Sequence, residues 1–311
     1  MKKFVTLEKA VGETPLAALE KYRSEHPELA NTKSARNFWM QMSLLQALRR
    51  KSHMWLYGDK PNVPKEREVH QKYPPMAYAG RLDPMASGKL LVLIGDECKR
   101  QKSYHALDKE YEFSVLLGVS SDTGDVLGRL SATTQAPQCN LATLEGSIEE
   151  LQGEITLPYP HFSAKTVAGK PLHVWTLENR LDEITIPTYC ATIHRLTLTR
   201  SEEKTGAEVA DEALLKIATI PPVTEQSKAL GQDFRRKDVR TDWREFKDRH
   251  ASETYTILHF TCTCSSGLYM RSLSERIAKI LGTKGLAFSI HRKEIGIYKK
   301  FWKFGLWVKK F

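Results

Sequence analysis

Residues 79–98 read Ala-Gly-Arg-Leu-Asp-Pro-Met-Ala-Ser-Gly-Lys-Leu-Leu-Val-Leu-Ile-Gly-Asp-Glu-Cys and decide the fold. They place one carboxylate, Asp83, before a proline and shortly ahead of an apolar run. Proline pushes the preceding residue away from the helical region, while Gly80 and Gly88 permit backbone conformations that other residues rarely adopt. The apolar run 90–94 is short and predicts a buried strand rather than a helix. We therefore expect Asp83 on a rigid loop that is anchored to the core.

The residues alone leave two interpretations of Asp83 open. Asp-Pro is a common turn initiator, so the carboxylate could do no more than cap a turn. The segment Arg-Leu-Asp-Pro-Met-Ala-Ser-Gly-Lys-Leu-Leu, however, resembles the catalytic-loop motif of pseudouridine synthases, most closely that of the TruB family. The resemblance implies that Asp83 is the nucleophile. The matching residues are Leu82, Asp83, Pro84, Ala86 and Gly88.

A second segment carries an aromatic candidate. Residues 109–117 alternate apolar and polar side chains and predict a half-buried strand. Lys-Glu-Tyr, followed by Leu-Gly-Val-Ser-Ser-Asp-Thr-Gly-Asp, resembles the second TruB motif. The resemblance implies that Tyr111 stacks on the target base with its hydroxyl near the reacting atoms. Without it, Tyr111 would be an ordinary core aromatic.

Two further motifs lie toward the C-terminus. Residues 254–264 are rich in β-branched and aromatic residues and predict a strand, which is followed by Gly-Leu-Tyr-Met-Arg and an amphipathic helix. Gly-x-Tyr-x-Arg resembles a third TruB signature and implies that Arg271 pairs with Asp83, with Tyr269 packed beside it. A carboxylate in a dry site needs such a cation to stay ionised. The segment that follows resembles the fourth motif and puts Ile290 under the base.

Other residues are candidates for RNA contacts. The segment 158–172 resembles the Pro-x-Tyr-Ser-Ala region of TruB, which leads into an element that closes over RNA, and it offers Lys165 and Lys170. Tyr78 stands where TruB has a histidine, so base flipping is expected to be assisted differently. Arg81 replaces a small residue, and Gly-Arg-Leu-Asp is the wording of the RsuA and RluA families. A synthase of that type, acting on rRNA, is therefore the alternative within the enzyme class.

Charge is unevenly distributed along the chain, which has a net charge of +10. Residues 31–75 hold nine Lys/Arg against three Asp/Glu, and residues 282–311 hold eight against one. Within 31–75, helical spacing of apolar residues predicts a basic amphipathic helix ending in Arg49, Arg50 and Lys51. The tail 299–311 has five aromatics and five lysines. Cations meet phosphates and rings stack on bases, so both blocks are expected to contact RNA.

The expected architecture is an α/β pseudouridine synthase fold with a mixed, mostly antiparallel sheet flanked by helices. Its catalytic domain would span 1–298, with insertions at about 31–75 and 201–253, followed by the tail and no PUA domain. The second insertion carries mixed charges that predict a solvated helix with internal ion pairs. The five cysteines lack the paired spacing of zinc knuckles and are expected to be free thiols.

The functional expectation is conversion of a uridine to pseudouridine in structured RNA, with uridine 55 of the tRNA T loop implied by the resemblance. No cofactor or metal is expected. The N-terminus lacks a secretory signal, so we expect a cytoplasmic protein, monomeric and not bound to membranes. The alternative from another class is a non-catalytic RNA-binding or RNA-folding protein on the same scaffold.

Overall fold

The computed structural model describes residues 2–30, 73–133, 141–221, 235–301 and 304–311. The chain divides into two compact units. The smaller comprises Met1–Lys9, Thr14–Leu82 and Leu90–His105, and the larger comprises Ala10–Glu13, Asp83–Lys89 and Ala106–Phe311. The amphipathic helix predicted within 31–75, with Arg49, Arg50 and Lys51, lies outside the described residues.

The smaller unit is built on the end of strand β3. Strands β1 and β2 both pair with β3. Helix α1 has Pro15 in its first turn, and the Thr14 hydroxyl accepts a hydrogen bond from the amide of Ala17 at 3.0 Å. Its buried face packs on β3. The elements are β1 (Phe4–Lys9), α1 (Pro15–Glu25), η1 (Pro27–Leu29), β2 (Met76–Tyr78), β3 (Ala86–Ile94), η2 (Gly95–Arg100) and α4 (Gln101–His105).

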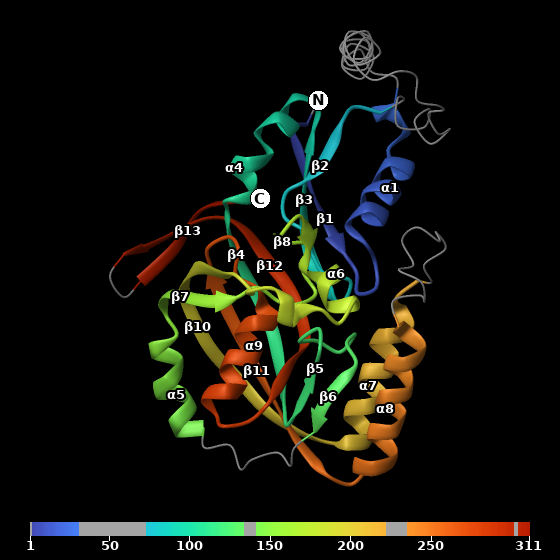
Figure 1. The fold of residues 1–311 in the computed structure, drawn as a ribbon. Helices are drawn as coiled ribbons and strands as arrows, with labels where there is room; N and C mark the ends of the chain where they lie inside the picture. The colour runs from blue at the N-terminus through green and yellow to red at the C-terminus, as the bar shows by residue number, and fades with distance from the viewer. Residues whose placement is uncertain (1, 31–72, 134–140, 222–234, 302–303) are drawn as a thin grey trace. The chain divides into compact units, whose positions relative to one another are not determined.

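The larger unit is a mixed sheet, drawn in Figure 1. Its strands pair in the order β3-β12-β4-β11-β10-β7, and β13 pairs with the C-terminal part of β12, from Gly296 to Phe301. Strands β3 and β12 run parallel, whereas the other pairs along this order are antiparallel. The predicted fold class is therefore confirmed. These strands are β4 (Asp108–Leu117), β7 (Gly153–Pro158), β10 (Thr188–Thr205), β11 (Thr254–Cys264), β12 (Gly285–Phe301) and β13 (Phe304–Lys310).

Short hairpins and helices surround this sheet. The hairpins are formed by β5 (Val119–Ser121) with β6 (Leu130–Thr133) and by β8 (Thr166–Val167) with β9 (Lys170–Pro171). The helices are α5 (Leu141–Glu150), α6 (Leu172–Leu177), η3 (Leu181–Glu183), α7 (Gly206–Thr219), α8 (Arg236–His250) and α9 (Met270–Ile280). In the part of the chain that is described, no helix has the length and apolar character needed to span a membrane.

The core lies around β4, β11 and β12. Phe113 on β4 stacks on Phe260 of β11, with ring centroids 5.3 Å apart. Helix α9 approaches closely, since a Cβ on Gly285 would lie 2.5 Å from the Cβ of Ala278. The predicted half-buried alternation on β4 holds only for its first half, because every residue from Phe113 to Leu117 is buried.

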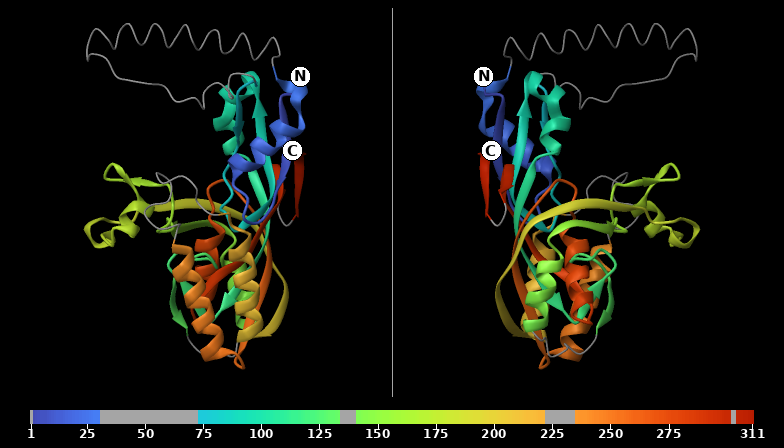
Figure 2. Two further views of the ribbon diagram at one scale, coloured as in Figure 1. Left: turned by 90° about the vertical axis from the view of Figure 1, so that its right-hand side faces the viewer. Right: turned by 90° about the vertical axis from the view of Figure 1, so that its left-hand side faces the viewer.

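Helices α7 and α8 form an antiparallel pair, seen side by side in Figures 1 and 2. The start of α7 is bonded to the end of α8, with the Gly206 amide donating to the Glu253 carbonyl at 2.8 Å. The solvated helix predicted here differs from what is found. Helix α8 buries Val239, Trp243 and Phe246, and most of its ion pairs reach other elements rather than its own turns. Its apolar residues recur at helical spacing, which the many charges around them concealed.

Candidate active site

The site centres on an ion pair between two of the predicted residues. Asp83 lies in the loop before β3, and Arg271 lies in the first turn of α9. Nε of Arg271 lies 2.8 Å from Oδ2 of Asp83. This Nε has no acceptor in hydrogen-bonding alignment, so the contact is an ion pair rather than a linear hydrogen bond. The side chain of Asp83 is 40% exposed and that of Arg271 only 6%, so the buried member is the cation.

Two backbone carbonyls hold the other end of Arg271. Nη1 donates to the carbonyl of Thr123 at 2.9 Å, and Nη1 and Nη2 both approach the carbonyl of Phe162 at 3.3 Å. A planar guanidinium whose two Nη atoms are hydrogen-bonded in this way has little freedom to rotate. Arg271 is therefore a fixed cation that presents its Nε side to Asp83.

A second carboxylate shares the same guanidinium. Oδ2 of Asp125 lies 3.8 Å from Nε of Arg271, and its side chain is 5% exposed. Oδ1 accepts from the Thr123 hydroxyl at 2.7 Å and from the Leu127 amide at 2.9 Å. Burial raises the pKa of Asp125, with Arg271 and these donors acting in the opposite direction. Burial works against the charge of Arg271, but the carboxylates of Asp83 and Asp125 outweigh it and raise its pKa.

Tyr111 stands on β4 and is partly buried. It lies directly across from Arg292 on β12, whose guanidinium bonds to its hydroxyl. Arg292 is 1% exposed and donates from Nε to the Lys89 carbonyl at 2.7 Å. Burial raises the pKa of Tyr111, Arg292 lowers it, and Asp83 is close enough to raise it further. The phenol is therefore protonated at neutral pH and has the Arg292 guanidinium beside its hydroxyl.

Tyr269 belongs to an aromatic cluster beside the ion pair. Its ring centroid lies 5.4 Å from that of Tyr189 and 5.9 Å from that of Tyr159. Burial raises the pKa of Tyr269, and the neighbouring Tyr159 and Asp83 add to the effect. The edge-on contacts fix the ring position just before α9. The predicted packing of Tyr269 next to Arg271 is thus consistent with the geometry.

Ile290 is buried on β12, where the strand meets β3. It pairs with Ala86 on β3 and with Phe113 on β4. The close approach depends on Gly88, which has φ +106° and where a Cβ would lie 2.3 Å from the Arg292 carbonyl. The structure thus joins the Asp83 loop to the strand that carries Ile290. The role of Ile290 under a base stays a prediction.

The two lysine candidates lie on and near the β8–β9 hairpin. Lys165 is exposed, with Nζ 5.0 Å from the centroid of the Tyr159 ring. Lys170 is ion-paired with Glu178 at 2.6 Å and lies over the ring of Trp175. Lys165 therefore adjoins the aromatic cluster, whereas the charge of Lys170 is partly balanced within the protein.

Tyr78 and Arg81 belong to the smaller unit. Tyr78 lies on β2, pairs with Val92 on β3 and packs against the cluster formed by Ala18, Leu19, Leu90 and Val92. Arg81 is exposed in the loop that leads to Asp83. Their predicted RNA contacts remain predictions, as do those of the segment outside the described residues.

Sequence reasoning missed three residues of the site. Asp125 and Thr123 belong to the Asp-Thr-Gly-Asp segment, which was noted as a motif without a role being given to either residue. Arg292 lies two residues after Ile290, on the same face of the strand, and belongs to no motif that the sequence analysis identified. A charged residue alternating with apolar ones on a core strand is the one available hint, because such a residue needs a buried partner.

Comparison with known proteins finds a matching family model and several relatives with similar sequences. The model of the N-terminal domain of TruB family pseudouridylate synthases matches residues 68–217. The tRNA pseudouridine synthase B of Psychrobacter cryohalolentis is 25% identical over 225 residues, which cover 71% of this chain and 47% of that protein. The tRNA pseudouridine synthase 4 of Saccharomyces cerevisiae is 28% identical over 253 residues, covering 71% of this chain and 60% of that protein.

Among solved structures, a chain in the crystal structure of a Cbf5-Nop10-Gar1 complex aligns with a TM-score of 0.45 and 13% identity. The alignment covers 94% of this chain and 48% of that one. The chain thus spans between about half and three fifths of the length of the curated relatives named above.

Proposed function

We propose that this chain, of which residues 68–217 match the model of the N-terminal domain of TruB family pseudouridylate synthases, isomerises uridine to pseudouridine in RNA. The reaction breaks the N1–C1′ glycosidic bond, turns the uracil within the site and joins C5 to C1′. The proton on C5 is lost to solvent and N1 gains one. Because product and substrate are isomers, the reaction consumes no oxidant or reductant.

The observation that carries the proposal is the Asp83–Arg271 pair. A partly exposed carboxylate lies 2.8 Å from a buried guanidinium that two backbone carbonyls hold in place. Such a carboxylate is oriented by its cationic partner and open to a substrate, as a nucleophile has to be. Asp83 would attack either the base or the ribose, and Arg271 would keep it charged and aligned.

The neighbouring residues would receive the base. A uracil has to leave its stack to reach a side chain in a protein pocket, and stacking on an aromatic ring offsets part of that cost. Tyr111 would provide the ring, with its protonated hydroxyl near the reacting atoms. Ile290 would line the apolar floor, and Tyr269 would hold the Arg271 side of the site.

We propose tRNA as the substrate class and uridine 55 of the T loop as the target. The names of both curated relatives refer to tRNA, which supports this choice. Lys165, Lys170, Arg81 and Tyr78 are proposed to contact the RNA, together with Arg49, Arg50 and Lys51.

Site mapping tests this substrate. An unmodified tRNA transcript is incubated with the protein and treated with a water-soluble carbodiimide, whose adduct survives mild alkali on pseudouridine and stops reverse transcription. We expect one stop next to uridine 55, and none in a transcript that carries cytidine there. Stops elsewhere would reject the site but keep the activity. Tight binding of tRNA without any stop would contradict the activity and favour the binding-only alternative.

A further inference from the structure

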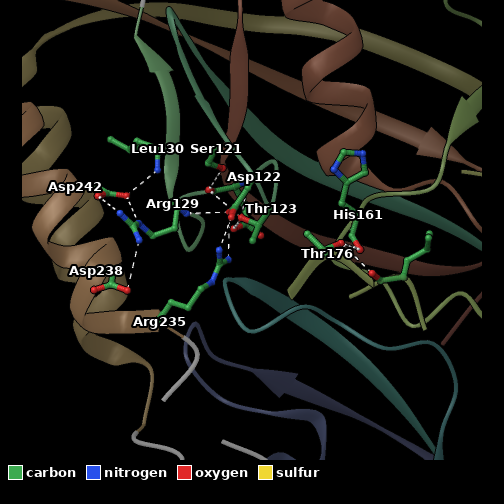
Figure 3. Close-up of polar contacts among 12 residues, drawn as sticks. Ser121, Asp122, Thr123, Arg129, Leu130, His161, Thr176, Arg235, Asp238 and Asp242 are labelled. Carbon is green, nitrogen blue, oxygen red and sulfur yellow. Dashed lines mark hydrogen bonds and ion pairs between the residues drawn. The ribbon is translucent and has the colours of Figure 1, made fainter. Parts of the chain in front are cut away.

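A charged residue outside the site contacts both loops that hold Arg271. Arg235 directly precedes α8, and its guanidinium donates to both carboxylate oxygens of Asp122, with Nη2 3.3 Å from Oδ1. Its Cζ lies 4.6 Å from the centroid of the Phe162 ring. Figure 3 shows the side chain reaching from α8 to Asp122. One side chain thus joins the turn after β5 to the loop after β7.

These two contacts lie next to the supports of Arg271. Asp122 immediately precedes Thr123, whose carbonyl accepts from Nη1 of Arg271 at 2.9 Å. Phe162 itself provides the second carbonyl, at 3.3 Å from both Nη atoms. A displacement of either loop would therefore move an acceptor of the guanidinium that faces Asp83.

Two residues of α8 also bond to the segment between β5 and β6. Oδ2 of Asp242 accepts from the amide of Leu130 at 3.0 Å and from Nε of Arg129 at 2.6 Å, as Figure 3 shows. Trp243 is fully buried and donates from Nε1 to the Val126 carbonyl at 3.0 Å. Asp242 and Trp243, which are adjacent on α8, thus both bond to the segment between β5 and β6.

The backbone of Arg235 supports a specific role. Its φ of +59° is in the left-handed region, which few residues other than glycine adopt. This residue directly precedes α8, and its guanidinium reaches Asp122 and the Phe162 ring.

We propose that Arg235 is a positioning residue, which holds the Asp122 turn and the Phe162 loop together and thereby fixes Arg271 against Asp83. The inference rests on the proposed function in so far as it concerns catalysis. It gives a part in the site to residues 201–253, the segment that was predicted to be an insertion and that contains Arg235. Arg235 itself does not touch the reacting atoms.

Hydrogen–deuterium exchange tests the structural half without any substrate. Arg235→Ala is compared with Arg244→Ala, which removes the same charge from an exposed position on the same helix. We expect faster exchange in peptides that cover 121–130 and 159–173 for Arg235→Ala, and unchanged exchange for Arg244→Ala. These peptides include the amides of Gly124, Leu127 and His173, which are bonded within the two loops. Unchanged exchange in Arg235→Ala would overturn the proposal.

Single-turnover kinetics test the catalytic half. With tRNA saturated by protein, Arg235→Ala should lower the rate of tritium release from C5-labelled uridine about tenfold, because small misplacements of catalytic groups are costly. The tRNA Kd should stay unchanged, and Arg235→Lys, which keeps the charge, should recover part of the rate. Arg244→Ala should match the wild type.

The two proposals fail in different ways. If the wild-type protein releases no tritium, the proposed function fails, and the exchange data alone decide whether Arg235 fixes the loops. If the wild type is active, a wild-type rate for Arg235→Ala would overturn the positioning role. The positioning role would also be overturned if the loss of rate equalled the fraction of the variant that thermal melting shows to be unfolded. Such a result would mean that Arg235 only stabilises the fold.

Discussion

At the scale of single residues, the site is one guanidinium shared by two carboxylates in different environments. Asp125 is 5% exposed and bonded to its own turn, whereas Asp83 is 40% exposed and lies 2.8 Å from Nε of Arg271. Asp125 therefore contacts the cation from the interior of the protein, and Asp83 is the more accessible of the two carboxylates. This asymmetry explains how two acidic residues near one arginine can have different roles.

The buried carboxylate leads to a prediction about pH. Burial raises the pKa of Asp125 above its ordinary value of 3.8, so the folded state binds this proton more tightly than the unfolded state. The resulting stability is fully present below pH 3.8 and is lost as the pH rises through the folded pKa. Asp125→Asn keeps an acceptor but cannot titrate. Its free energy of unfolding relative to wild type should therefore increase with pH above 3.8.

Urea unfolding at a series of pH values checks this sign. Within the window in which Asp125 titrates, the difference between variant and wild type should change by up to about 1.4 kcal/mol per pH unit. Thr241→Ala, on the exposed side of α8, removes no titrating group and should give a difference that does not vary with pH. A difference for Asp125→Asn that falls with rising pH would contradict the account.

At the scale of elements, the site depends on the parallel pairing of β3 with β12. Their parallel pairing brings the loop that carries Asp83 beside the strand that carries Ile290 and Arg292. The pairing is possible because Gly88 has φ +106° and no side chain where the Arg292 backbone passes. Close backbone approach of this kind is a role that only glycine fills.

Substitution of Gly88 tests this dependence. A Cβ there would lie 2.3 Å from the Arg292 carbonyl, on a backbone conformation that is strained for any other residue. Gly88→Ala should lower the free energy of unfolding by about 2 kcal/mol or more. Gly146→Ala is the matched control, because Gly146 lies within α5 and a Cβ there meets nothing within 4 Å. That change should raise stability by about 0.5–1 kcal/mol, and equal effects of the two would refute this role for Gly88.

Elements with strong local signals could be predicted from the sequence. Strand β11 has the predicted bounds, because its β-branched and aromatic residues specify an extended backbone. Helix α1 begins at Pro15, because Thr14 supplies its cap. In the site, the local motifs predicted Asp83, Tyr269 and Arg271, and the structure brings them together.

What the sequence could not predict depends on distant contacts. The parallel pairing of β3 with β12 joins residues about 200 positions apart, and no local pattern encodes it. Asp125 becomes a site residue only because the β5–β6 turn meets α9. Arg235 likewise reaches Asp122, more than a hundred residues earlier in the chain. Such partners follow from tertiary packing, which overrides local propensity.

At the scale of the whole molecule, a net charge of +10 favours a polyanionic partner. Not every cation is equally available for it. Lys170 and Lys247 are each held by a carboxylate of the protein, at 2.6 and 2.7 Å, whereas Lys165 lies exposed over an aromatic ring. Phosphate contacts release counterions and make binding dependent on salt, so the cations that contact RNA can be identified one by one.

Salt titrations of tRNA binding make this distinction. Lys165→Ala should weaken binding and reduce the slope of log K against log salt by about 1. Lys170→Ala should have a smaller effect, because Glu178 already balances part of that charge. Lys247→Ala, the control from an ion pair between α7 and α8, should leave the slope unchanged. A wild-type slope for Lys165→Ala would remove this residue from the RNA interface.

In the proposed function, Asp83, fixed by Arg271, converts uridine to pseudouridine. The most direct measurement is tritium release from tRNA labelled at uridine C5, with the wild type, Asp83→Asn and the control Asp248→Asn. The account predicts release by the wild type and by the control, and a rate at least about 1,000-fold lower for Asp83→Asn, because an amide cannot replace a carboxylate nucleophile. Release by Asp83→Asn at the wild-type rate would contradict it.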